Sequence, residues 1–105
     1  MIQWYKNLYI GDNAKKREKR IREKLEKRKL VKGIQLITLA SNSENQLDVI
    51  PASLLKQDAV FNMLPVVVGI ASDYDEAIEV VGRITAEVYL NTGDCQIRKF
   101  LENQK

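Results

Sequence analysis

Histidine is absent from the 105-residue sequence, and Cys95 is its single cysteine. The lack of an imidazole excludes histidine acid–base catalysis, serine–histidine triads and zinc sites with histidine ligands. A lone cysteine cannot form a disulfide within the chain, which is typical of a reducing cytoplasm.

No apolar run approaches the roughly 20 residues of a membrane helix. The first residues also lack a basic segment followed by a long apolar stretch. We therefore expect no signal peptide, no membrane partner and a cytoplasmic location.

The composition is that of a folded domain with an uneven distribution of charge. Hydrophobic residues make up 45% and charged residues 30% of the chain, which argues against disorder and predicts one domain over residues 1–105. Residues 1–33 hold 12 Lys or Arg and 4 Asp or Glu, a net charge of +8, whereas residues 34–105 hold 5 and 10, a net charge of −5. This asymmetry favours an anionic partner on one side, or self-association of opposite ends.

Residues 65–93 predict a buried strand, a polar turn and an amphipathic helix. The apolar run at 66–71 is typical of a strand covered on both faces, as in parallel sheets. Asp73 and Glu76 have the spacing of a helix capping box, and Gly93 suits a helix C-terminus. Gly82 weakens the helix interior by roughly 1 kcal/mol relative to alanine, which close packing against a neighbour would explain. The inward face of this helix is predicted to carry Ala77, Ile78, Val80, Val81, Ile84, Val88 and Tyr89.

The remaining pattern predicts further strands at residues 8–10, 34–40 and 95–101, and helices at about 14–30 and 52–61. Such alternation indicates an α/β domain with a mainly parallel four-stranded sheet and two or three helices, in the order β-α-β-(α)-β-α-β. The expected strand order is 2-1-3-4, a truncated flavodoxin-like arrangement. The apolar stripe of the helix at 14–30 is too narrow to cover this sheet. We expect the Trp4/Tyr5 segment, the C-terminal tail or a second subunit of a homodimer to complete that face.

Polar turns at residues 11–13, 41–43 and 72–74 follow the predicted strands. In a parallel sheet they would converge at the carboxyl ends of the strands, where ligands bind. The candidate residues of this strand-end crevice are Asp12, Ser41, Asn42, Ser72 and Asp73. The alternative is that these residues only cap helices and solvate loops.

The helix at 14–30 begins with three cations, which oppose the positive end of the helix dipole. A bound anion would offset them, so the candidate phosphate-binding residues are Asn13, Lys15, Lys16 and Arg17. The segment GDNAKKR matches neither of the glycine-rich phosphate motifs.

A basic stripe of Lys16, Arg20, Lys24 and Lys27 could instead follow the backbone of a nucleic acid, without base specificity. The alternative is a solvated helix with internal ion pairs.

Asp73 and Asp75 have a DxD spacing that can hold Mg²⁺ after a strand, and Asp12 could join them. The spacing resembles that of the Toprim domains of primases and topoisomerases, which place a glutamate where this chain has Gly11-Asp12. The resemblance implies a magnesium-dependent phosphoryl or nucleotidyl enzyme. Helix capping explains Asp73 and Asp75 without a metal.

Four segments, LYIGDNAKKREKR, LITLASNSENQLDVIPASLLKQ, LPVVVGIASDYDEAIEVV and EVYLNTGDCQIRKF, resemble a group of small uncharacterised α/β proteins from Clostridia-like Firmicutes. The resemblance implies a compact cytoplasmic bacterial protein and adds no catalytic residue. The leading hypothesis is a binding or regulatory module, not an enzyme, for a phosphorylated small molecule or a nucleic acid. The alternatives are the magnesium enzyme and a homodimeric interaction module.

Overall fold

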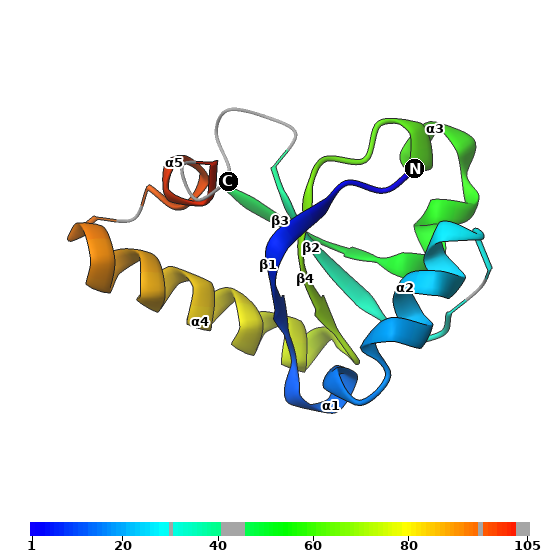
Figure 1. Cartoon of the computed structure of the whole chain (residues 1–105), viewed down its shortest axis with the longest axis horizontal. Helices are drawn as coiled ribbons and strands as arrows, with labels where there is room; N and C mark the ends of the chain where they lie inside the picture. The colour runs from blue at the N-terminus through cyan, green and yellow to red at the C-terminus, as the bar shows by residue number, and fades with distance from the viewer. Residues whose placement is uncertain (30, 41–45, 95, 103–105) are drawn as a thin grey trace.

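The computed structural model describes residues 1–29, 31–40, 46–94 and 96–102, which are organised around a four-stranded mixed sheet (Figure 1). Its strands are β1 (Trp4–Ile10), β2 (Gln35–Leu39), β3 (Leu47–Pro51) and β4 (Val67–Ala71). They lie in the order β1-β4-β2-β3. Strand β4 pairs in parallel with β1, whereas β2 is antiparallel to both β4 and β3. The apolar strand β4 is therefore central, and all five of its residues are buried.

The prediction of a mainly parallel sheet in the order 2-1-3-4 is wrong, because only one of its three strand pairs is parallel. A continuous apolar run requires that both faces of a strand are covered, and it does not specify the direction of the neighbouring strands. Strand β3 was not predicted either, because residues 47–50 resemble the approach to a helix starting at Pro51. In the structure β3 forms a hairpin with β2, and Pro51 pairs with Gln35 at its end.

The helices also differ from the prediction of two or three, since the described residues contain five α-helices and one 3₁₀ helix. The basic helix predicted at 14–30 is divided by a turn into α1 (Asp12–Lys15) and α2 (Glu18–Glu26). The helix predicted at 52–61 consists of the 3₁₀ helix η1 (Ala52–Lys56) and α3 (Asp58–Asn62).

The edge strand predicted at 95–101 is wrong, because residues 97–102 form helix α5 (Ile97–Glu102). Ile97 and Leu101 are four residues apart and are both buried, which is the spacing of one helix face. Arg98 pairs with Glu102 at 3.0 Å on the outer side of the same helix. Cys95 lies outside the described residues.

The long helix α4 (Tyr74–Thr92) confirms the prediction of a helix after β4. The side chain of Asp73 accepts a hydrogen bond from the Glu76 amide at 2.8 Å, and Gly93 ends the helix at φ 77°. Two residues predicted to face inward, Ile78 and Tyr89, are 48% and 56% exposed. A Cβ on Gly82 would meet no atom of the described chain within 4 Å, so close packing does not explain this glycine here.

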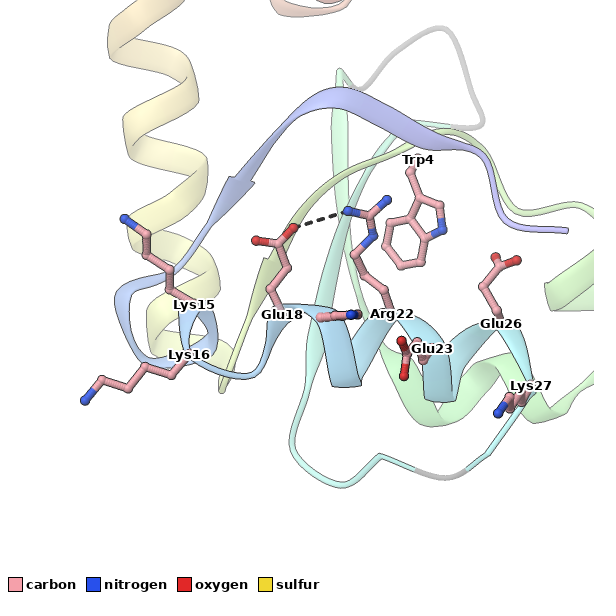
Figure 2. Close-up of a pocket in the computed structure, with 9 residues that line it drawn as sticks. Trp4, Lys15, Lys16, Glu18, Arg22, Glu23, Glu26 and Lys27 are labelled. Atoms are coloured by element: carbon pink, nitrogen blue, oxygen red, sulfur yellow. Dashed lines mark hydrogen bonds and ion pairs between the residues drawn. The ribbon is translucent and has the colours of Figure 1, made fainter.

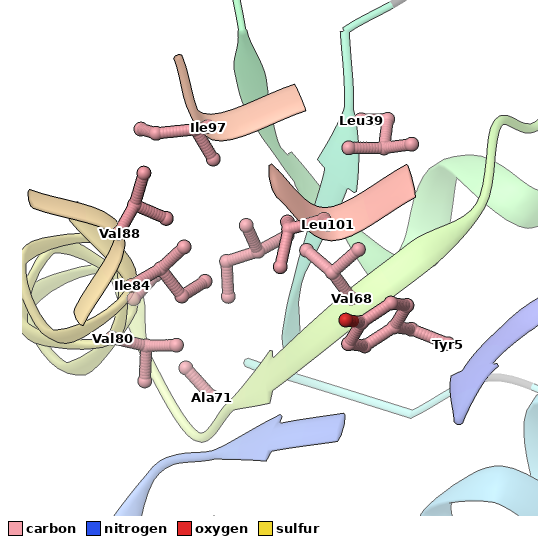
Figure 3. Close-up of a cluster of buried hydrophobic side chains, with 11 residues drawn as sticks. Tyr5, Leu39, Val68, Ala71, Val80, Ile84, Val88, Ile97 and Leu101 are labelled. Atoms are coloured by element: carbon pink, nitrogen blue, oxygen red, sulfur yellow. The ribbon is translucent and has the colours of Figure 1, made fainter. Parts of the chain in front are cut away.

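Helices cover both faces of the sheet (Figure 1). Strand β4 contributes side chains to the buried clusters on both faces. On one face, α4 and α5 pack on the sheet, and Figure 3 shows Val80 and Ile84 directed toward Val68 of β4. Gly69 permits close approach of α4 there, because a Cβ would lie 3.2 Å from Val80 Cγ1 and 2.9 Å from the Tyr9 carbonyl oxygen of β1. On the other face, α2 and η1 contribute Ile21, Leu25 and Leu55 to the second buried cluster.

The narrow stripe of α2 is thus supplemented by η1, α3 and the N-terminal segment, whose Ile2 and Trp4 belong to the same cluster. Helix α5 at the C-terminal side packs on the opposite face instead. Of the helices in the described residues, none has both the length and the apolar character needed to cross a membrane.

Candidate functional site

A buried carboxylate lies at the end of the sheet where the parallel strands β1 and β4 both finish. Glu76, in the first turn of α4, is only 5% exposed. Its Oε1 accepts a hydrogen bond from the Ser72 amide at 2.9 Å, and its Oε2 accepts one from the Asn13 amide at 2.8 Å. This side chain therefore joins the turn after β4 to the start of α1, which follows β1.

Gly11 makes room for that carboxylate. Its φ of −64° is open to any residue, so its backbone conformation does not require glycine. A Cβ at this position, however, would lie 2.1 Å from Glu76 Oε1 and 2.3 Å from Glu76 Cδ. The glycine is needed because the carboxylate lies directly against the backbone.

The Glu76 carboxylate is ionised at neutral pH. Burial by itself would raise its pKa, but the hydrogen bonds from the Ser72 and Asn13 amides outweigh burial and hold the pKa below its usual value. The Asn13 amide, a candidate for binding an external phosphate, thus donates to an anion of the chain itself. The Glu76 carboxylate therefore supplies the negative charge that is favourable at the N-termini of α1 and α4.

The residues predicted for a strand-end crevice do not all converge. Asp12 and Asp73 are exposed near Glu76, and Ser72 is half-buried. Ser41 and Asn42 lie outside the described residues, and they follow β2, which runs in the opposite direction to β4. Within the described ranges, no group of three His, Cys, Asp or Glu residues is placed to hold a metal ion, so Asp12, Asp73 and Asp75 form no such group.

Two hollows lie on either side of α2. The larger, here named the Trp4 hollow, has a volume of about 710 Å³ and lies between α2 and β1 (Figure 2). It is lined by Trp4, Lys15, Lys16, Glu18, Lys19, Arg22, Glu23, Glu26 and Lys27. The smaller, here named the Val31 hollow, has a volume of about 270 Å³ and is lined by Arg17, Arg20, Ile21, Lys24 and Val31. The predicted basic stripe is therefore shared between the two hollows.

Protein contacts engage two of the three carboxylates in the Trp4 hollow. Glu18 pairs with Arg22 at 3.2 Å, as the dashed line in Figure 2 marks. The Arg22 guanidinium also lies over the Trp4 ring, 5.0 Å from its centroid. Glu26 accepts a hydrogen bond from the Ile2 amide at 2.9 Å. In the part of the chain that the structure describes, the four lysines of this hollow form no ion pair, so its unpaired charge is positive.

Arg28, just beyond α2, is engaged by the fold and does not extend this cationic surface. It pairs with Asp58 at 2.8 Å and donates to the carbonyl oxygen of Leu55 at 3.1 Å. Its guanidinium also lies 4.7 Å from the centre of the Phe61 ring. These contacts attach the end of the basic segment to η1 and α3.

A second cluster of polar side chains, which the sequence did not predict, lies on the face of the sheet that α4 covers. The Tyr9 hydroxyl donates to the Glu87 carboxylate, and Arg83 donates to the Ile10 carbonyl oxygen at 3.2 Å. Burial and, as the second largest cause, the hydrogen bond to Glu87 raise the pKa of Tyr9 far above its usual value. The hydroxyl therefore stays protonated, and the contact ties α4 to β1. Tyr9 and Glu87 are 78 positions apart, so no local signal could pair them.

No protein-family model, curated protein or solved structure matches this chain.

Proposed function

We propose that the surface formed by α1, α2 and Trp4 binds the phosphate groups of a nucleic acid. The observation that carries the proposal is the gathering of cations around one short helix. Seven Lys or Arg side chains line the two hollows without an ion pair among the described residues: Lys15, Lys16, Lys19 and Lys27 in the Trp4 hollow, and Arg17, Arg20 and Lys24 in the Val31 hollow.

The extent of this surface favours a polymer over a small phosphorylated molecule. Helix α2 has nine residues, so it is about 13 Å long at 1.5 Å per residue. Each strand of a duplex carries one phosphate per about 3.4 Å along the duplex axis, so a helix of this length can face more than one phosphate. A small molecule with one phosphate would engage one hollow and leave the cations of the other unpaired.

The carboxylates of the surface cancel only part of this charge, because the two hollows are lined by eight Lys or Arg and three Glu side chains. Glu18 is paired with Arg22, and Glu26 accepts a hydrogen bond from a backbone amide, which leaves its charge in place. Glu23 alone of the carboxylates in the Trp4 hollow has no such contact among the described residues. Binding by such a surface releases counterions and is therefore independent of base sequence and sensitive to salt.

The test is fluorescence anisotropy with labelled oligonucleotides at low salt, using two charge-matched variants. The first, Lys16→Gln with Lys24→Gln, removes one lysine from each hollow. The second, Lys56→Gln with Lys99→Gln, removes two exposed lysines that line neither hollow. We expect the first variant to bind about tenfold or more weakly, because it neutralises two fewer phosphates, and the second to bind within about twofold of the natural chain.

Two results would contradict the proposal. One is the absence of binding by the natural chain at low salt. The other is an equal drop in affinity in both variants, because it would mean that net charge, and not this surface, governs the association.

A further inference from the structure

We infer that the nucleic acid bound here is single-stranded and that one of its bases stacks in the Trp4 hollow. This inference rests on the proposed function and specifies its ligand. The hollow combines flat side chains with cations, which is the combination that proteins use to hold unpaired bases together with their backbone.

The flat groups are Trp4 and Arg22. Trp4 is half-buried on β1, which is an edge strand of the sheet. The guanidinium of Arg22 lies over its ring at 5.0 Å and is held from the other side by Glu18 (Figure 2). Bases stack on indole rings and on guanidinium planes alike. The ion pair with Glu18 keeps the guanidinium in place before any base arrives.

The volumes of the two hollows indicate which part of the nucleic acid each can hold. The Trp4 hollow, at about 710 Å³, falls within the roughly 300–1,000 Å³ of pockets that hold small organic groups. The Val31 hollow, at about 270 Å³, lies below that range and is lined by no aromatic residue. The geometry therefore assigns the base to the Trp4 hollow and backbone phosphates to the cations on both sides of α2.

A duplex does not fit this arrangement equally well. Its bases are already paired and stacked, and each would have to leave the helix to reach Trp4, at an energetic cost that a single strand does not incur. A single strand can present a base to the hollow while its neighbouring phosphates face Lys15 and Lys19. Single strands should therefore bind more tightly than duplexes of the same length.

The experiment uses Trp4 as its own probe, because it is the only tryptophan in the chain. Its fluorescence is recorded while the natural chain is titrated with a single-stranded oligonucleotide, a duplex and inorganic polyphosphate. We expect the single strand to quench the emission, and the duplex and polyphosphate to leave it nearly unchanged. In parallel anisotropy titrations, Trp4→Leu should weaken single-strand binding about 5- to 150-fold, as removal of one stacking interaction does. Trp4→Phe keeps a ring and should recover most of the affinity.

The outcomes separate this inference from the proposed function. If a single strand binds by anisotropy but leaves the Trp4 emission unchanged, stacking is overturned and the cationic surface stands. Equal affinity for single strands and duplexes likewise overturns the inference alone. If no nucleic acid binds at low salt, both are overturned. The fluorescence result is obtained on the natural chain, so it holds even where a Trp4 variant fails to fold.

Discussion

At the residue scale, Gly11 and Glu76 depend on one another. The spacing of Asp73 and Glu76 predicts the start of α4, and that start is confirmed. The burial of Glu76 could not be predicted, because the amide of Asn13, one of its donors, is 63 positions away. Local spacing places Glu76 on the polar face of the helix. The glycine opposite it and the converging amides make the buried position favourable.

A double-mutant cycle tests this dependence. Gly11→Ala should destabilise the natural chain by about 1–3 kcal/mol, since its Cβ overlaps the carboxylate. In a Glu76→Ala background the overlap is gone and φ at this position suits alanine, so the same change should cost less than about 0.5 kcal/mol. The measurement is urea unfolding of all four proteins. Additive free energies would show that the two residues do not interact.

The ionised state of Glu76 predicts a dependence on pH. Glu76→Gln should cost about 2 kcal/mol near neutral pH, because glutamine offers one uncharged acceptor oxygen, and the second backbone amide then faces an NH2 group that cannot accept its hydrogen bond. The folded-state pKa of Glu76 is depressed, so its contribution is complete above the usual carboxyl pKa of 4.5 and disappears as the pH falls through the folded-state value. The stability difference between the two proteins should therefore shrink below about pH 4.5. Unfolding at several pH values measures it, and a difference that grew on acidification would contradict the account.

At the element scale, segments with strong local signals were predicted and those that depend on partners were not. The strand β4 has an apolar run, and α4 has a cap at each end. The strand β3 has a mixed pattern, and its pairing with β2 makes it a strand. Helix α5 is too short for its periodicity to stand out, and it is fixed by burial of Ile97 and Leu101 against the α4 side of the core.

Two glycines, one within α4 and one at its end, should respond in opposite directions to the same substitution. Gly82 is exposed in the helix interior with open space around its Cβ position, so Gly82→Ala should stabilise the chain by about 1 kcal/mol. Gly93 has φ 77°, so Gly93→Ala should destabilise it by about 1 kcal/mol or more. Thermal and urea unfolding measure both effects. A decrease in stability in Gly82→Ala would mean that α4 packs closely against another surface at this point.

At the scale of the whole molecule, the positive charge of the N-terminal third is gathered on one side of the fold. The basic N-terminal third forms β1, α1 and α2, and the cations gather in the two hollows. The sequence predicts that these cations lie along a helix, because they recur at helical spacing. It does not predict the Trp4 hollow, because that hollow arises only when α2 packs on the face of the sheet where Trp4 of β1 joins the same buried cluster.

The sheet order explains why the predicted crevice did not form as expected. A parallel sheet would bring all three polar turns to one end, whereas the antiparallel direction of β2 takes its carboxyl end to the opposite one. At the end shared by β1 and β4, the interior is occupied by the Glu76 carboxylate. We therefore propose the cationic surface around α2, and not this end of the sheet, as the site for an anionic partner.

The most direct test of this account is the salt dependence of single-strand binding, compared between the natural chain and a variant with Lys16, Arg20, Lys24 and Lys27 changed to glutamine. If these side chains face phosphates, the slope of log K against log salt should become shallower by about 0.7 for each phosphate that is no longer neutralised, or about 3 in all. The Lys56→Gln, Lys99→Gln protein should keep the slope of the natural chain. An unchanged slope in the four-site variant would contradict the central claim that α1 and α2 form the phosphate-binding surface.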